Sequence, residues 1–124
     1  MAVHYSREHQ WIDTGTPDGA RVGITTFAQD TLGDIVFVEL PAVGKVFRQG
    51  EVAAVVESVK TAADVFMPAS GEVIAVNEAL RADPALANTD PLGAAWFFTV
   101  KLSDPGELDG LLDETAYAAF AAGT

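Results

Sequence analysis

The sequence predicts a mostly β protein built around one core. Alternating and β-branched runs fill roughly the first hundred residues, a pattern typical of strands. Short clusters of Gly, Pro and Asp separate these runs at the spacing expected for turns. With 124 residues, 49% of them hydrophobic, the chain is long enough for one compact core and too short for two ordinary domains. We therefore expect a single domain over residues 1–124.

The first expected elements are a hairpin and a short helix. Strands over residues 10–14 and 20–24 flank a connection rich in turn residues, which is typical of a β-hairpin. Thr26 and Gln29 fit a capping box, which indicates the start of a helix. Gly33 stands where a left-handed C-terminal cap is expected.

The middle of the chain is expected to consist mainly of strands. Residues 34–40 form a near-continuous apolar run, which predicts a strand buried on both faces. Strand segments continue over residues 45–76, where Gly50 and Gly71 lie at nearly equal distances on either side of Lys60. This spacing resembles two matched half-units joined by a hairpin whose tip is near that lysine.

The last part of the chain is expected to combine a loop, one strand and helices. Residues 77–91 are predicted to form a loop with a helical turn, because two Asp-Pro pairs interrupt any longer element. A last strand follows over residues 96–102. A C-terminal helical segment is expected at about residues 104–121, with Asp104 as its cap and Glu107 at the reciprocal capping position. The apolar residues of its two pieces are Leu108, Leu111, Leu112, Tyr117 and Phe120.

The charge balance excludes several classes of partner. Seven basic and 18 acidic residues give a net charge of −11, which repels nucleic acid and anionic membrane surfaces. The acidity accounts equally well for simple solubility. The first ten residues contain no apolar stretch that could serve as a secretory signal or membrane span. We therefore expect a cytoplasmic protein, as a monomer, with neither nucleic acid nor membrane as its partner.

Few residues are suited to catalysis or metal binding. The chain has no cysteine and two histidines, too few for most metal sites. No nucleophile motif accompanies His4 or His9, so both are expected to have structural or surface roles. The aromatic residues are expected to anchor the core, since basic residues do not alternate with them. They include Trp11, Phe37, Phe47, Phe66, Trp96, Phe97 and Phe98.

Lys60 is a candidate site for acylation because of the residues around it. It lies between two β-like runs, with small residues beside it, in a hairpin expected at about residues 51–67. A lysine at a tight hairpin tip projects its amine into solvent, where an acylating enzyme can reach it. The position alone does not identify a modification site, because most exposed lysines only solvate the surface.

Short motifs along the chain strengthen this interpretation. They are His9-Gln10-Trp11, residues 22–25, 28–29, 32–41 and 57–60, Pro68, residues 70–73 and 76–80, Asn88, Asp90-Pro91, Gly93, Trp96, residues 111–113 and Tyr117. Together these motifs extend over nearly the whole chain. In them the sequence closely resembles the glycine cleavage H-protein family.

The resemblance implies a fold and a cofactor. The fold is a barrel-sandwich hybrid with a short helix after the first hairpin and helices at the C-terminus. The cofactor is lipoic acid, linked covalently to Lys60 as an amide, and Glu57, Ser58 and Val59 complete the attachment segment. Glu57 and Glu39 either orient the modifying enzyme or are simply solvated. On this interpretation the chain is a carrier and not an enzyme, because the reactions belong to its partners and to the cofactor.

The resemblance also implies a set of partners. Glycine decarboxylase loads an aminomethyl group onto the lipoyl arm, an aminomethyltransferase takes the methylene and releases ammonia, and dihydrolipoyl dehydrogenase reoxidises the dithiol. A lipoyl or octanoyl transferase, or a lipoate ligase, attaches the arm.

The sequence departs from the family where the loaded arm would be protected. In the family the arm folds into a surface cleft, of which Asp64 matches one position, and Glu8 falls where relatives often have a small hydroxyl residue. Gln10 stands where the family usually has glutamate, and Phe27 where a histidine or another aromatic residue is found. A neutral amide cannot pair with a protonated amine as a carboxylate could. We hypothesise that Glu8 or Asp64 compensates.

Three other functions compete with the H-protein interpretation. A biotin-carrying domain resembles Ala-Met-Lys-Met at its modified lysine, whereas Val59 and Thr61 flank Lys60 here. In the lipoyl domain of a 2-oxoacid dehydrogenase, the N-terminal motif and the C-terminal helix would be surplus. An H-like protein that relays lipoyl groups to other 2-oxoacid dehydrogenase complexes remains an open alternative, because sequence does not separate it from a glycine cleavage component.

Overall fold

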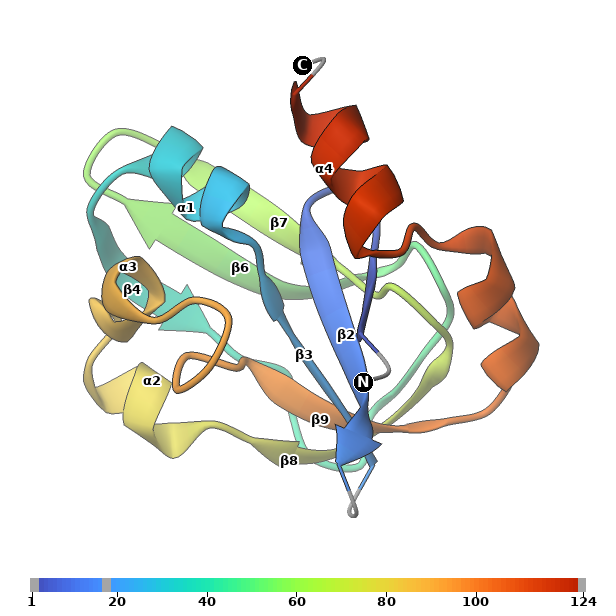
Figure 1. The fold of residues 1–124 in the computed structure, drawn as a ribbon. Helices are drawn as coiled ribbons and strands as arrows, with labels where there is room; N and C mark the ends of the chain where they lie inside the picture. The colour runs from blue at the N-terminus through green and yellow to red at the C-terminus, as the bar shows by residue number, and fades with distance from the viewer. Residues whose placement is uncertain (1–2, 17–18, 123–124) are drawn as a thin grey trace.

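The computed structural model describes residues 3–16 and 19–122. In chain order its elements are β1 (Val3–Tyr5), β2 (Gln10–Thr16), β3 (Gly19–Ile24), α1 (Thr26–Leu32), β4 (Ile35–Glu39), β5 (Val46–Phe47), β6 (Val52–Ser58), β7 (Ala62–Phe66), β8 (Gly71–Val76), α2 (Glu78–Ala82), α3 (Leu86–Thr89), β9 (Phe98–Leu102), the 3-10 helix η1 (Pro105–Gly110) and α4 (Glu114–Ala122). The described strands form two antiparallel sheets, one in the order β1-β2-β3-β9-β8-β5 and one in the order β4-β6-β7 (Figure 1). The prediction of a mostly β fold is confirmed.

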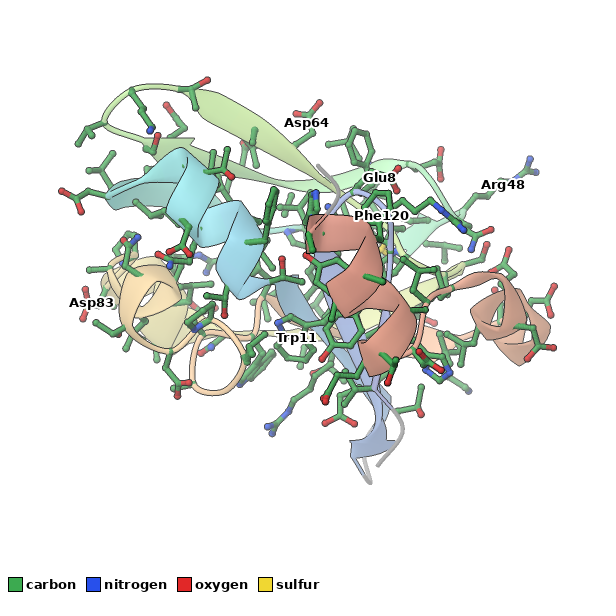
Figure 2. The ribbon with its side chains drawn as sticks, turned by 45° about the horizontal axis from the view of Figure 1, so that its top comes forward. Glu8, Trp11, Arg48, Asp64, Asp83 and Phe120 are labelled. Atoms are coloured by element: carbon green, nitrogen blue, oxygen red, sulfur yellow. The ribbon has the colours of Figure 1, made fainter. Side chains whose placement is uncertain are left out.

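One hydrophobic cluster draws its side chains from both sheets. Its fully buried members include Ile12, Val22, Val56, Val73, Phe97 and Phe98. Charged side chains such as Arg48 and Asp83 project outward instead (Figure 2). Burying these apolar groups at about 25 cal/mol per Å² is the main force that holds the two sheets together.

The strand β4 differs from its expected burial. Ile35 and Val38 are buried, but Val36 is 55% and Phe37 50% exposed. β4 lies at the edge of the three-stranded sheet, and its pairing with β6 is irregular between Ile35 and Phe37. The prediction that both faces are buried was wrong, because an apolar run alone does not show which strand lies at an edge. Phe37 is therefore not a core anchor, and Phe66 and Trp96 are only partly buried.

The N-cap of the helix α1 lies one residue before the expected cap. Thr25, and not Thr26, is the N-cap: its Oγ1 accepts a hydrogen bond from Ala28 N at 3.3 Å. Gly33 is the C-cap at the expected position, with its N–H donating to Gln29 O at 2.9 Å. Its φ of +79° is positive as expected, but its ψ of −150° lies outside the left-handed helical region. Since glycine adopts a positive φ without strain, this residue can end the helix directly below the β6–β7 hairpin.

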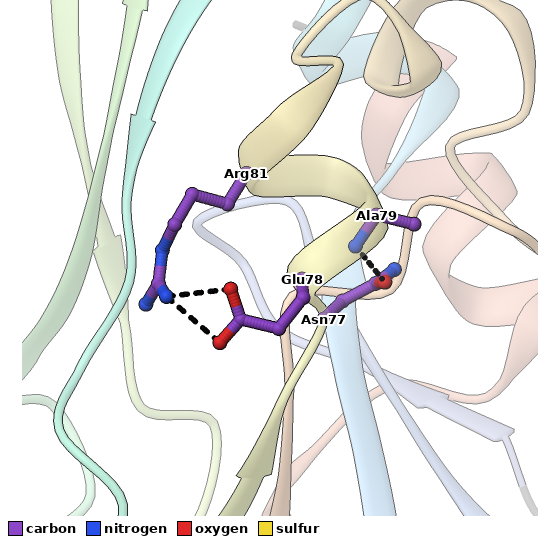
Figure 3. A network of polar contacts seen from close by, with 4 residues as sticks. All are labelled: Asn77, Glu78, Ala79 and Arg81. Atoms are coloured by element: carbon purple, nitrogen blue, oxygen red, sulfur yellow. Dashed lines mark hydrogen bonds and ion pairs between the residues drawn. The ribbon is translucent and has the colours of Figure 1, made fainter.

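The segment expected to be a loop with a helical turn contains two short helices, α2 and α3. The side chain of Asn77 caps α2 by accepting from Ala79 N at 3.2 Å, and Arg81 pairs with Glu78 at 2.6 Å on its exposed face (Figure 3). Asn77 also donates to Ala94 O and Trp96 O, both at 2.8 Å. The following strand β9 begins at Phe98, two residues later than predicted.

The C-terminal segment starts as the 3-10 helix η1 and continues as α4. Asp104 caps η1 by accepting from Gly106 N at 3.1 Å. Glu107 does not take the predicted reciprocal position, because its carboxylate accepts from the N–H and the hydroxyl of Ser70 at 2.6 and 2.9 Å. Within the described residues, no helix is long and apolar enough to cross a membrane.

The helix α4 returns to the N-terminal strands, next to β2 in Figure 1. Just before it, Leu112 exchanges two backbone hydrogen bonds with Tyr5 at 2.7 and 2.8 Å. The ring of Tyr117 then stacks on that of Tyr5 with centroids 4.7 Å apart. These contacts attach the C-terminal helix to the edge of the larger sheet.

Candidate functional site

Lys60 lies at the tip of the β6–β7 hairpin, in the connection between Ser58 and Ala62. Ser58 orders this connection: its N–H donates to Thr61 O at 2.8 Å, and its hydroxyl oxygen accepts from Lys60 N at 3.3 Å and Thr61 N at 3.1 Å. The backbone of the tip is thus held by local bonds, while the Lys60 side chain is exposed. The hairpin and its tip lie where the sequence predicted them.

The tip rests on the junction between α1 and β4. Val59 N donates to Asp34 O at 3.0 Å. A Cβ atom added to Gly33 would lie 3.5 Å from Lys60 Cε and 3.8 Å from its Nζ. The Lys60 side chain therefore lies over the C-terminal end of α1, which gives its amine a defined starting position.

Asn88 supports this junction and was not singled out as a site residue by the sequence. Its amide oxygen accepts from Ile35 N at 2.8 Å, and its amide nitrogen donates to Gly33 O and to Gln29 Oε1, both at 2.8 Å. One side chain on α3 thus fixes both ends of the segment on which the hairpin tip rests. The Asn88 motif was visible in the sequence, but its partners lie more than fifty residues away.

The Asn88→Ala substitution is expected to lower the free energy of unfolding by about 2 kcal/mol, because it leaves the partly buried Ile35 N–H and Gly33 carbonyl without this partner. Denaturant titration measures the loss, and amide hydrogen exchange should quicken at Ile35. Thr89→Ala on the same helix is the control, with a change within about 0.5 kcal/mol. Equal stability of the two variants would show that Asn88 does not hold the junction.

A pocket of about 180 Å³ lies beside α1 and the hairpin. Its walls come from the β1–β2 turn with the start of β2, the end of β3, the helix α1, and the strands β6 and β7. The lining residues are Glu8, His9, Gln10, Ile24, Phe27, Ala28, Thr31, Leu32, Val56, Ala63, Asp64 and Val65. Four residues singled out from the sequence, Glu8, Gln10, Phe27 and Asp64, are thus brought to one place (Glu8 and Asp64 are labelled in Figure 2).

The polar groups of the pocket differ in their exposure and in whether the protein already occupies their hydrogen-bonding atoms. Glu8 and Asp64 are exposed. Gln10 is only 2% exposed; its Oε1 accepts from Ser6 Oγ at 2.7 Å and its Nε2 donates to Glu8 O at 2.8 Å. Because both ends of this amide are occupied by the protein, Gln10 serves the β1–β2 turn, and the exposed carboxylates are the charged groups available to a ligand.

His9 is a pocket residue that sequence reasoning assigned only a structural or surface role. Its ring stacks on Phe27 with centroids 4.3 Å apart. Burial lowers the pKa of His9, although the charge of Glu8 acts in the opposite direction. This lowered pKa favours the neutral form of the ring. The motif His9-Gln10-Trp11 was visible in the sequence, but it did not indicate that His9 lines a pocket.

The other residues of the predicted attachment segment lie outside the pocket. Glu57 is exposed on β6 and pairs with Phe37 and Ala62 of the neighbouring strands. Val59 is 70% exposed beside Lys60. The attachment segment is accessible from solvent, and the pocket lies next to it along α1. The two therefore form adjacent parts of one site.

Comparison with known proteins assigns the chain to a family. The glycine cleavage H-protein family model matches residues 3–123. Glycine cleavage system H proteins of Methylocella silvestris and Bradyrhizobium diazoefficiens are 58% and 52% identical over 118 residues, covering 95% of this chain and 94% and 96% of theirs. The crystal structure of the Mycobacterium marinum H protein superposes with a TM-score of 0.87 at 43% identity, covering 98% of this chain and 97% of that one. The fold is accordingly the expected barrel-sandwich hybrid, and the chain belongs to the glycine cleavage H-protein family.

Proposed function

We propose that Lys60 is the residue on which this H protein carries its lipoyl group. As a member of its family, the chain is a non-catalytic lipoyl carrier of the glycine cleavage system. The observation that supports Lys60 is its exposed side chain at the tip of an ordered hairpin, over the end of the helix that lines the pocket. Glu57, Ser58 and Val59 complete the segment that the modifying enzyme recognises.

The residues around Lys60 fit a long and mostly apolar arm. Its primary amine can form an amide, which removes one positive charge and changes the net charge from −11 to −12. The arm reaches roughly 10 Å beyond the lysine, and a helix of the length of α1 spans about the same distance. The pocket beside α1 gives the arm an apolar lining of buried side chains, which come from Ile24, Leu32, Val56 and Val65. When bound, the lipoyl group supplies a dithiolane that takes up the aminomethyl group and two electrons.

The partners follow from this role. We propose that the chain carries the aminomethyl group from glycine decarboxylase to the aminomethyltransferase and electrons to dihydrolipoyl dehydrogenase, after a lipoyl or octanoyl transferase or a lipoate ligase has acylated Lys60. A net charge of −11 favours encounters with basic surfaces on such enzymes. We further propose that residues 1–124 act as one carrier domain and that the protein works as a cytoplasmic monomer.

Exchange between the carboxyl group of glycine and bicarbonate tests this function. With cognate glycine decarboxylase, exchange should depend on the lipoylated chain and remain at background with the unmodified chain. Exchange that stays at background with the lipoylated chain would contradict the glycine cleavage role. Transfer of the lipoyl group from that same preparation to a 2-oxoacid dehydrogenase complex would then favour the relay function.

Glu8 and Asp64 are proposed to hold the protonated amine of the carried group, in place of the carboxylate that Gln10 lacks. The double variant Glu8→Gln/Asp64→Asn is expected to release the carried group to water about fivefold faster, since charge-assisted hydrogen bonds to exposed carboxylates contribute about 1 kcal/mol. Formaldehyde release from the loaded protein measures the rate. The charge-matched control is Glu72→Gln/Asp109→Asn, which alters exposed residues outside the pocket lining. Equal rates in the two double variants would refute this role.

A further inference from the structure

The backbone of His9 adopts an unusual conformation at the pocket wall. Its φ is +67°, in the left-handed region that residues other than glycine rarely adopt. The conformation is held by hydrogen bonds on both sides: His9 N donates to Ser6 O at 3.2 Å, and His9 O accepts from Thr25 N at 3.0 Å. A backbone conformation in this region costs energy, so it is kept only where surrounding contacts hold it. Residues in such conformations cluster at functional sites.

The ring of His9 is connected to the C-terminal helix. Its Nδ1 lies 2.6 Å from the hydroxyl oxygen of Tyr117 on α4, and that oxygen lies 2.7 Å from Oγ1 of Thr25. Phe27 covers one side of the imidazole, and Phe120 of α4 lies 5.8 Å away, centroid to centroid. A chain of three polar groups therefore joins the β1–β2 turn, the N-cap of α1 and the C-terminal helix.

The direction of the protons in this chain follows from Thr25. Its side chain is 2% exposed, and its Oγ1 already accepts the N–H of Ala28. Its hydroxyl proton needs an acceptor, because a buried donor without one costs about 1–3 kcal/mol. Among the contacts of the described residues, the Tyr117 oxygen meets this need. Thr25 then donates to Tyr117, and Tyr117 donates to His9.

This direction fixes the tautomer of His9. Burial raises the pKa of Tyr117, so its hydroxyl keeps the proton that it donates. With Nδ1 accepting that proton, a neutral imidazole carries its own proton on Nε2. The ring that lines the pocket is therefore a hydrogen-bond donor.

We propose that Tyr117 and Thr25 hold His9 as an Nε2–H donor to the amine nitrogen of the carried aminomethyl group, so that the C-terminal helix helps to retain the loaded arm. The inference rests on the proposed attachment at Lys60. The Lys60 amine lies at the C-terminal end of α1 and His9 near its N-terminal end, and the arm spans the intervening distance of about 10 Å. The free end of an arm laid along α1 thus reaches His9.

Retention follows from the chemistry of the neutral amine. Release to water requires the nitrogen lone pair to form a C=N bond while the C–S bond breaks and the sulfur leaves as a thiolate. Water then converts the released fragment to formaldehyde and ammonium. A donor that occupies the lone pair slows the first step, whereas Glu8 and Asp64 act on the protonated form. Tyr117 is thus a positioning residue, and His9 contacts the carried group.

Two hydroxyl deletions in one aromatic cluster test the assignment. Tyr117→Phe removes the donor to His9, and Tyr5→Phe is the matched control, because the two rings stack and the Tyr5 hydroxyl takes no part in the chain of bonds from Thr25 to His9. In ¹⁵N spectra of the full chain, His9 of the wild type and of Tyr5→Phe should carry its proton on Nε2. The Nδ1 signal should move in Tyr117→Phe as its hydrogen bond is lost. A proton on Nδ1 in the wild type would overturn the proposal.

The second measurement uses the lipoylated full chain, reduced and then loaded with formaldehyde and ammonium. Tyr117→Phe should release formaldehyde about fivefold faster than wild type, as expected for the loss of one hydrogen bond, while Tyr5→Phe should match wild type. Equal rates for Tyr117→Phe and Tyr5→Phe would overturn the proposal and leave the carrier function intact. A chain that gains no lipoyl mass at Lys60 would overturn the carrier function instead. The ¹⁵N spectrum would still decide which ring nitrogen of His9 carries the proton.

Discussion

The Lys60→Arg variant is expected to acquire no lipoyl group and to support no glycine–bicarbonate exchange above background. Arginine preserves the positive charge and nearly the length of the side chain, so the exposed hairpin tip should fold unchanged. Its guanidinium stays protonated at all accessible pH values and offers no free amine to an acyl donor. Intact mass and the exchange assay measure the two losses, and circular dichroism checks the fold.

The remaining lysines provide matched controls for this substitution. Lys45 and Lys101 are also exposed, and they complete the set of lysines in the chain. Lys45→Arg and Lys101→Arg should therefore gain one lipoyl group and support exchange at the wild-type rate. Exchange above background in Lys60→Arg would refute the assignment of the arm to this residue.

Gly71→Ala is expected to cause the largest loss of stability from a single added methyl group, about 3 kcal/mol. Gly71 pairs with Leu102 of β9 on one side and Phe47 of β5 on the other. A Cβ atom there would lie 2.5 Å from the backbone oxygen of Lys101 and 3.3 Å from Leu102 Cα. Since these are backbone atoms of a paired strand, they can move away only if the β8–β9 pairing opens.

Gly110→Ala is the control for that prediction. An added Cβ at Gly110 meets no atom within 4 Å, so the substitution should change the free energy of unfolding by less than about 0.5 kcal/mol. Urea titration of both variants measures the difference. A Gly71→Ala variant as stable as Gly110→Ala would show that the larger sheet accommodates the methyl group.

Local patterns in the sequence were sufficient to predict most of the fold. Hydrophobic alternation and turn residues located the first hairpin, the β6–β7 hairpin and the last strand within a few residues. The exposure of Val36 and Phe37 could not be predicted in this way, because it depends on which strand forms the edge of the smaller sheet. The role of Glu107 also depended on tertiary structure, since Ser70 competes for its carboxylate.

The candidate site was predictable only in part. The motif around Lys60 and the resemblance to the family pointed to the attachment segment, and four of the predicted residues meet in the pocket. The contact between His9 and Tyr117 joins residues 108 positions apart, and Thr25 lies 92 positions from the same tyrosine. A single sequence carries no signal for such pairs, because they form only when the C-terminal helix packs on the N-terminal strands.

Mass spectrometry of the full chain, expressed with lipoate and a lipoate ligase, shows whether Lys60 carries the lipoyl group. We expect a gain of one lipoyl group per chain, located by peptide mapping on the segment that contains Lys60. An unchanged mass, or a lipoyl group on Lys45 or Lys101, would contradict it.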